Sequence, residues 1–85
     1  MNIIKTNAET KEQEVITSRQ ASYEIWYRWH NGWDQVYNPM CGISYESWTM
    51  MPDEIEHGLE HGIEFSTFNA TYSGEFFKTY DYKLA

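Results

Sequence analysis

The chain contains one short run of residues with the spacing of a metal-dependent catalytic site, His57-Gly58-Leu59-Glu60-His61. On a helix, residues four positions apart share a face, so the imidazoles of His57 and His61 could bind Zn²⁺ while the Glu60 carboxylate acts as a general base. Such a site also needs a further acidic ligand and a substrate cleft, and a chain of 85 residues leaves little room for either. We therefore expect a helix end with exposed histidines, with no metal site and no cofactor.

The sequence contains no other recognisable catalytic motif, and no flanking signature supports a nucleophile pair of Cys41 with a histidine. Cys41 is the only cysteine, so the chain has no CxxC pair and cannot form an internal disulfide. No glycine-rich phosphate loop or nucleophile elbow occurs. We predict that the protein is not an enzyme. The N-terminal segment lacks the apolar region of a signal peptide, and no apolar run is long enough for a membrane span, so we expect a soluble cytoplasmic protein.

The charge of the chain is strongly negative and unevenly distributed. The chain has thirteen acidic residues and six Lys and Arg, which gives a formal net charge of −7. Between Asp34 and Phe77 there is no Lys or Arg and there are eight acidic residues, whereas the rest of the chain sums to +1. This excess disfavours direct binding to nucleic acid or to an anionic membrane, both of which are polyanions. It favours a basic protein as the partner.

Carboxylates within this stretch have the spacing of a continuous negative surface. Helix side chains three and four positions apart are about 5–6 Å from each other, and Asp53, Glu56 and Glu60 follow that spacing, with Glu64 just beyond. Such a row can occupy a basic groove that normally holds DNA or RNA. The candidate partner-binding residues are this row, further acidic residues that extend it if the fold brings them alongside, and two tryptophans at its rim: Asp34, Glu46, Asp53, Glu56, Glu60, Glu64, Glu75, Trp26 and Trp33.

The aromatic residues indicate an alternative function. The chain has four Trp, seven Tyr and four Phe. Without interleaved basic residues, this cluster is not typical of a platform for nucleic-acid bases, but stacking on sugars needs no positive charge. The alternative is therefore an aromatic-ligand or sugar-binding module that uses Trp26 and Trp33. A small metal-binding protein, with His57, Glu60 and His61 as ligands, is the third.

The elements that position these residues can be predicted from local patterns. Residues 2–6 and 15–17 favour strands, and residues 23–30 alternate with a period of two, which predicts a third strand. Asn31-Gly32 then predicts a hairpin with a return strand over residues 33–37, and a short strand over 43–45 is also compatible with the pattern.

The second half of the chain has clearer signals. Pro52, followed by two acidic residues, predicts the start of a helix, and Gly62 predicts its end, so we expect a helix over residues 52–61. Residues 63–68 and 75–84 read as two strands. The expected fold is a single α+β domain over residues 1–85, with a small antiparallel sheet of about four strands and this one short helix.

In size, acidity and aromatic content the chain resembles small phage-encoded anti-defence proteins, a class that includes anti-CRISPR and DNA-mimic anti-restriction proteins. The local resemblance covers seven residues and is similar to an NGWxQxY stretch of a small acidic anti-CRISPR inhibitor: Asn31, Gly32, Trp33, Asp34, Gln35, Val36 and Tyr37. The resemblance implies a non-enzymatic inhibitor whose partner is a CRISPR effector or a restriction enzyme, acting in the host cytoplasm. Polyanion mimicry and binding away from the nucleic-acid groove both remain open, as does the oligomeric state.

Overall fold

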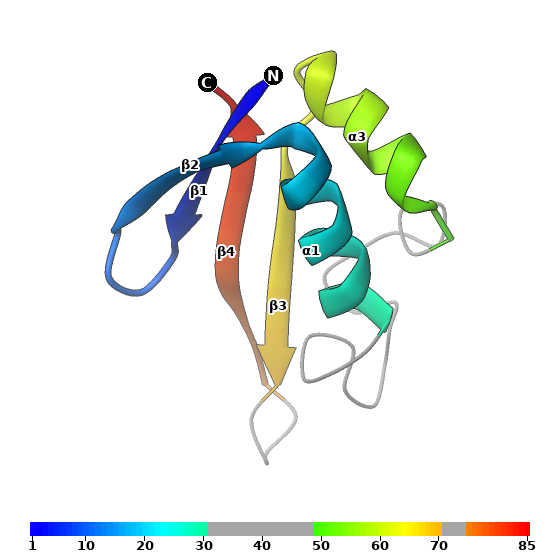
Figure 1. The fold of residues 1–85 in the computed structure, drawn as a ribbon. Helices are drawn as coiled ribbons and strands as arrows, with labels where there is room; N and C mark the ends of the chain where they lie inside the picture. Colours follow the sequence, from blue (N-terminus) through cyan, green and yellow to red (C-terminus); the bar gives the residue numbers. More distant parts are fainter. Residues whose placement is uncertain (31–48, 71–74) are drawn as a thin grey trace.

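The computed structural model describes residues 1–30, 49–70 and 75–85, which form an α+β fold. A four-stranded antiparallel sheet has the strand order β2-β1-β4-β3, and both helices lie on one of its faces (Figure 1). The elements are β1 (Asn2–Asn7), β2 (Gln13–Thr17), α1 (Ser18–His30), α3 (Pro52–Glu60), β3 (Phe65–Ala70) and β4 (Phe76–Leu84). The predicted α+β class and the antiparallel sheet of about four strands are confirmed, whereas the described residues contain two helices where one was predicted. The predicted hairpin at Asn31-Gly32 and the short strands over 33–37 and 43–45 lie outside the described residues.

The first two strands form a hairpin whose turn is shaped by Asn7. Its side-chain Oδ1 accepts hydrogen bonds from the backbone N–H groups of Glu9 and Thr10, at 2.9 and 3.0 Å. Lys11 then adopts a left-handed backbone conformation with φ of 66°. Both strands that were predicted here, over residues 2–6 and 15–17, are confirmed and extend slightly further.

The predicted strand over residues 23–30 is wrong, because this segment belongs to helix α1. The buried residues of α1 are Ser18, Ala21, Ser22, Ile25 and Trp29, and their spacing is that of one helical face. The helix begins after Thr17, whose Oγ1 accepts a hydrogen bond from the Gln20 N–H at 3.1 Å. This N-cap pattern, a Thr followed three residues later by Gln, is the sequence signal for the helix.

Helix α3 agrees with the predicted helix over residues 52–61. Pro52 occupies the first helical position, and the Glu54 side chain accepts a hydrogen bond from the Met51 N–H at 3.0 Å. The chain leaves the helix through Gly62, whose φ of 89° favours glycine. Gly58 lets α3 pack closely on β3, because a Cβ at this position would lie 3.1 Å from Phe65 Cζ.

The β3–β4 hairpin confirms the two strands that were predicted near the C-terminus. Its register shifts between Thr67, which pairs with Tyr80, and Phe68, which pairs with Lys78. Such a bulge changes which face the following side chains occupy. The alternation of side chains along β4 is therefore interrupted within the strand.

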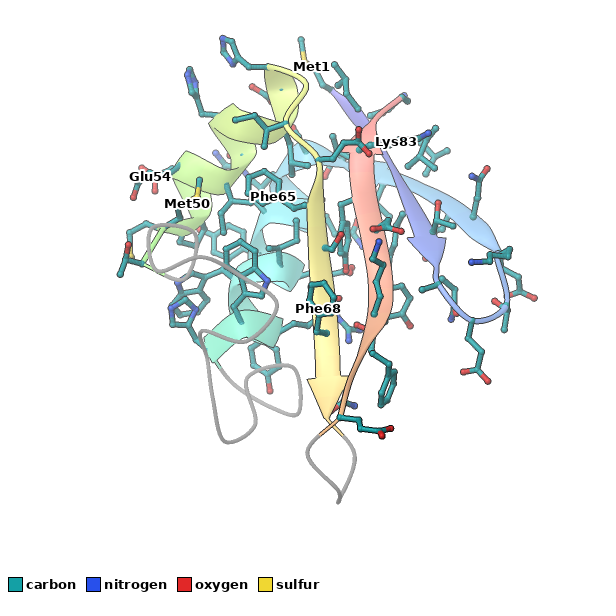
Figure 2. All side chains as sticks on the ribbon, turned by 180° about the vertical axis from the view of Figure 1, so that it is seen from behind. Met1, Met50, Glu54, Phe65, Phe68 and Lys83 are labelled. Atoms are coloured by element: carbon teal, nitrogen blue, oxygen red, sulfur yellow. The ribbon has the colours of Figure 1, made fainter. Side chains whose placement is uncertain are left out.

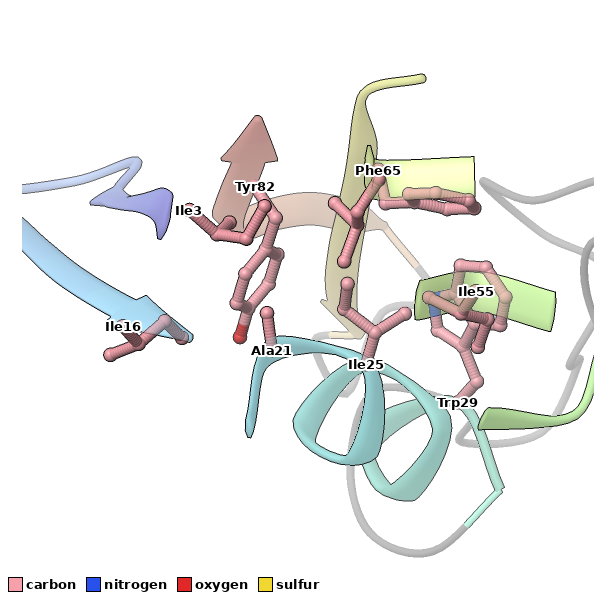
Figure 3. Packing of buried hydrophobic residues seen from close by; sticks show 9 residues of the cluster. Ile3, Ile16, Ala21, Ile25, Trp29, Ile55, Phe65 and Tyr82 are labelled. Carbon is pink, nitrogen blue, oxygen red and sulfur yellow. The ribbon is translucent and has the colours of Figure 1, made fainter. Parts of the chain in front are cut away.

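The core lies between the sheet and the two helices (Figure 3). The Trp29 indole N–H donates a hydrogen bond to the Ser66 carbonyl at 3.2 Å, and its ring lies 5.9 Å from that of Phe65. The opposite face of the sheet carries the half-buried Phe68 and the exposed Lys83 (Figure 2). The buried hydrophobic residues are Ile3, Ile16, Ala21, Ile25, Trp29, Ile55, Leu59, Phe65 and Tyr82.

Across residues 1–30, 49–70 and 75–85, no helix has the length and apolar character needed to cross a membrane.

Candidate functional site

Helix α3 places three of the predicted acidic residues on successive turns. Asp53 is exposed in the first turn, where its charge also complements the helix dipole, and Glu56 and Glu60 follow at spacings of three and four. Glu64 is exposed and lies between the end of α3 and the start of β3. We call Asp53, Glu56, Glu60 and Glu64 the acidic face.

Two residues of the acidic face contact side chains of α1. The Ser18 hydroxyl donates a hydrogen bond to Glu60 Oε2 at 2.6 Å. Arg19 Nε lies 3.8 Å from Glu56 Oε1, but the Arg19 side chain is 75% exposed, so this ion pair is weak. Glu56 and Glu60 are half-buried, and they consequently lie at the α1 side of the acidic face.

Glu75, the one remaining predicted acidic residue that the structure describes, does not join this surface. Glu75 is exposed beside the start of β4, at the opposite end of the β3–β4 hairpin from Glu64. At about 3.3 Å per strand residue, the length of β3 separates the two by roughly 20 Å. Asp34, Glu46 and Trp33 lie outside the described residues.

The two histidines of the H-x-x-E-H run lie side by side at the C-terminal end of α3, with ring centroids 4.1 Å apart. The Nδ1 of His61 lies 2.8 Å from the His57 carbonyl oxygen, within hydrogen-bond distance. Glu60 contacts Ser18 instead. In the part of the chain that the structure describes, no group of three or more His, Cys, Asp or Glu side chains is arranged to hold a metal ion.

Trp26, the other predicted aromatic contact, is only partly exposed. Its indole stacks on the His30 ring, with centroids 5.1 Å apart, and the side chain packs against the core. The most exposed aromatic side chains of α1 are Tyr23 and Tyr27, at 56% and 60%. Sequence reasoning missed them because it predicted a strand over residues 23–30; the i,i+4 spacing of a helix would have placed them together.

These two tyrosines line a hollow between α1, the end of β1 with its turn, and β4. Phe77, which is 48% exposed, and Tyr80 face them from β4. We call this feature the aromatic hollow, and its main lining residues are Tyr23, Glu24, Tyr27 and Arg28 of α1 with Phe77 and Tyr80 of β4.

A partly buried polar network supports the inner side of the aromatic hollow. Glu24 Oε1 accepts hydrogen bonds from Lys5 Nζ at 2.8 Å and from the Tyr82 hydroxyl at 2.9 Å. Lys5 Nζ and Arg28 Cζ lie 4.4 and 4.5 Å from the centroid of the Tyr80 ring, so both cations contact one aromatic ring. Burial and the neighbouring Glu24 carboxylate raise the pKa of the Tyr82 hydroxyl well above its usual range.

The described structure thus presents two distinct surfaces, the acidic face on α3 and the aromatic hollow beside α1. Comparisons of the chain with protein-family models, with curated proteins and with solved structures gave no match.

Proposed function

We propose that this protein is a small acidic, non-enzymatic inhibitor that binds a basic nucleic-acid-handling protein and covers its DNA- or RNA-binding surface. The partner class is that of a CRISPR effector or a restriction enzyme, and the place of action is the cytoplasm of a host cell. The observation that carries the proposal is the separation of charge along the chain: the segment of residues 49–70 has five acidic residues and no Lys or Arg.

The geometry of α3 supports this use of the charge. Asp53 and Glu64 are exposed at the two ends of the acidic face, and Glu56 and Glu60 connect them along one helix. Spacings of about 5–6 Å between such side chains are close to the separation of successive phosphates along a nucleic-acid strand. A basic groove that binds phosphates would therefore attract this face by the same electrostatic interaction.

The attraction has a testable dependence on ionic strength. At about 0.1 M salt, charges farther apart than about 10 Å are largely screened from each other. Complex formation through the acidic face should therefore weaken steeply as salt is raised, chiefly through a slower association rate. A contact made through apolar side chains would respond much less.

The experiment is affinity capture from bacterial lysate at increasing NaCl, followed by competition with a labelled DNA duplex for each captured protein. We expect captured proteins with basic nucleic-acid-binding surfaces, release at high salt, and mutual exclusion with DNA. The variant Glu56→Gln/Glu64→Gln should weaken binding at least about tenfold, a change in binding free energy of about 1.4 kcal/mol.

The matched control is Glu12→Gln/Glu14→Gln, which removes the same charge from exposed positions on the β1–β2 hairpin. This control should bind like the unmodified protein if the position of the charge matters and not only its amount. Equal loss in both variants, or a captured partner that still binds DNA while complexed, would contradict the proposal.

A further inference from the structure

The aromatic hollow has the composition of a small-molecule site. It is an open hollow of about 1100 Å³, and it is lined by residues of α1, the end of β1 with its turn, β3 and β4. Ligand sites in proteins typically enclose about 300–1000 Å³ and combine mostly apolar walls with a few polar groups. We propose that the hollow is a carbohydrate-binding site in which an uncharged sugar ring stacks on Tyr23 and Tyr27.

The aromatic side chains supply the stacking surface. Tyr23 and Tyr27 lie one helical turn apart on α1 and are 56% and 60% exposed, and Phe77 is 48% exposed on the facing strand. One face of a pyranose ring presents C–H groups, whose partial positive charge is attracted to the negative face of an aromatic ring. Covering these rings with a sugar would also remove apolar area from water.

The polar side chains supply hydrogen bonds suited to hydroxyl groups. Gln20 and Asn7, which carry amide side chains, are among the lining residues, and Asn7 Oδ1 already accepts two hydrogen bonds within the β1–β2 turn. The Glu24 carboxylate is held by Lys5 and Tyr82, and both of these bonds go to Oε1. Because a carboxylate can accept about four hydrogen bonds, Glu24 retains acceptor capacity for a sugar hydroxyl while its orientation is already fixed.

The charge of the lining favours an uncharged ligand. Glu9 and Glu24 are balanced by Arg28 and Lys78, so the lining formed by the described residues carries no net charge, within a chain of net charge −7. Lys78 is further engaged by Asp81, at 3.2 Å. An anionic ligand, such as a nucleotide, would gain little from these cations because each already contacts a carboxylate or an aromatic ring.

The site is separate from the acidic face and does not depend on the proposed inhibitor function. The hollow uses the outer face of α1 together with β4, whereas the acidic face belongs to α3 and the segment after it. The variant Glu56→Gln/Glu64→Gln should therefore leave sugar binding unchanged. The two proposals can fail independently.

The test is a titration of the ¹⁵N-labelled protein with glucose, galactose, N-acetylglucosamine and their β1,4-linked oligomers at millimolar concentrations, followed by NMR. We expect saturable shifts of backbone amides in residues 20–28 and 77–80 with at least one of these sugars. Tyr23→Ala/Tyr27→Ala should raise the dissociation constant at least about tenfold. Tyr27→Phe should bind nearly as well as the unmodified protein, because it keeps the ring.

Two controls separate loss of the site from loss of the fold. The amide spectrum of Tyr23→Ala/Tyr27→Ala away from α1 should match that of the unmodified protein, since both side chains are exposed. Val15→Ala/Ile63→Ala, which removes exposed apolar groups outside the hollow, should leave the affinity unchanged. The absence of saturable shifts with every sugar, or shifts that persist in Tyr23→Ala/Tyr27→Ala, would overturn the assignment.

Discussion

The hydroxyl of Tyr82 is buried under α1 and donates a hydrogen bond to Glu24, and burial together with this carboxylate raises its pKa. The folded protein therefore keeps the hydroxyl protonated at a pH where the unfolded chain has lost the proton. This contribution to stability is fully present below the unfolded pKa of about 10 and is lost as pH rises from there toward the folded pKa. The expected loss is about 1.4 kcal/mol per pH unit in this range.

The measurement is urea unfolding from about pH 8 to about pH 11, compared between the unmodified protein and Tyr82→Phe. At the lower pH the variant should be less stable by about 1–3 kcal/mol, because Glu24 loses the hydrogen bond from Tyr82 and keeps only the one from Lys5. Above about pH 10 the two stability curves should converge, since only the unmodified protein carries this titrating group. A gap that stays constant up to the highest pH would show that Tyr82 is not the titrating residue.

At the scale of elements, the contact between α3 and β3 depends on Gly58. Alanine in a helix interior is favoured over glycine by about 1 kcal/mol, but its Cβ would lie 3.1 and 3.3 Å from Cζ and Cε2 of Phe65. We expect Gly58→Ala to bring little or no stabilisation in the unmodified protein. In a Phe65→Leu background, which lacks both ring atoms, Gly58→Ala should stabilise by about 1 kcal/mol, as measured by a double-mutant cycle. Additive effects would contradict the packing argument.

The comparison of α1 with α3 shows how far sequence patterns predict the fold. Two local signals predicted α3 correctly: Pro52, which marks its start, and Gly62, which follows its end. Both act through the conformation of the neighbouring backbone and need no tertiary contact. The strand predicted over residues 23–30 was wrong because Tyr23 and Tyr27 were treated as apolar residues that alternate with polar ones. In α1 both tyrosine rings are exposed. The cap formed by Thr17 was the better signal.

The two candidate surfaces, the acidic face and the aromatic hollow, could also be predicted only in part from the sequence. The spacing of Asp53, Glu56 and Glu60 needs only a helix, so it follows from the sequence once α3 is predicted. The contact between Glu60 and Ser18 joins residues 42 positions apart and depends on how α1 packs against α3. The aromatic hollow likewise requires the register of β4 against α1, including the bulge, which no local pattern specifies.

At the scale of the whole molecule, the acidic face has opposite consequences for stability and for binding. Its carboxylates repel one another in the folded state, and Arg19 is the one basic side chain within an ion-pair distance of them among the described residues. Like charges three or four positions apart on a helix destabilise it by a few tenths of a kcal/mol per pair. A basic partner would relieve this repulsion, so the same charges that weaken the free protein strengthen the complex.

Glu64→Gln tests this relation, because Glu64 is exposed and lies after the end of α3. We expect the free energy of unfolding to rise by a few tenths of a kcal/mol at low salt, as measured by urea unfolding. The gain should disappear at about 1 M NaCl, where the screening length falls to about 3 Å. Glu14→Gln, on β2 opposite Lys5 in the strand register, should show no such salt-dependent gain. If Glu64→Gln destabilised the free protein at low salt, the carboxylate would be contributing to the fold, and the acidic face would need a structural explanation before a functional one.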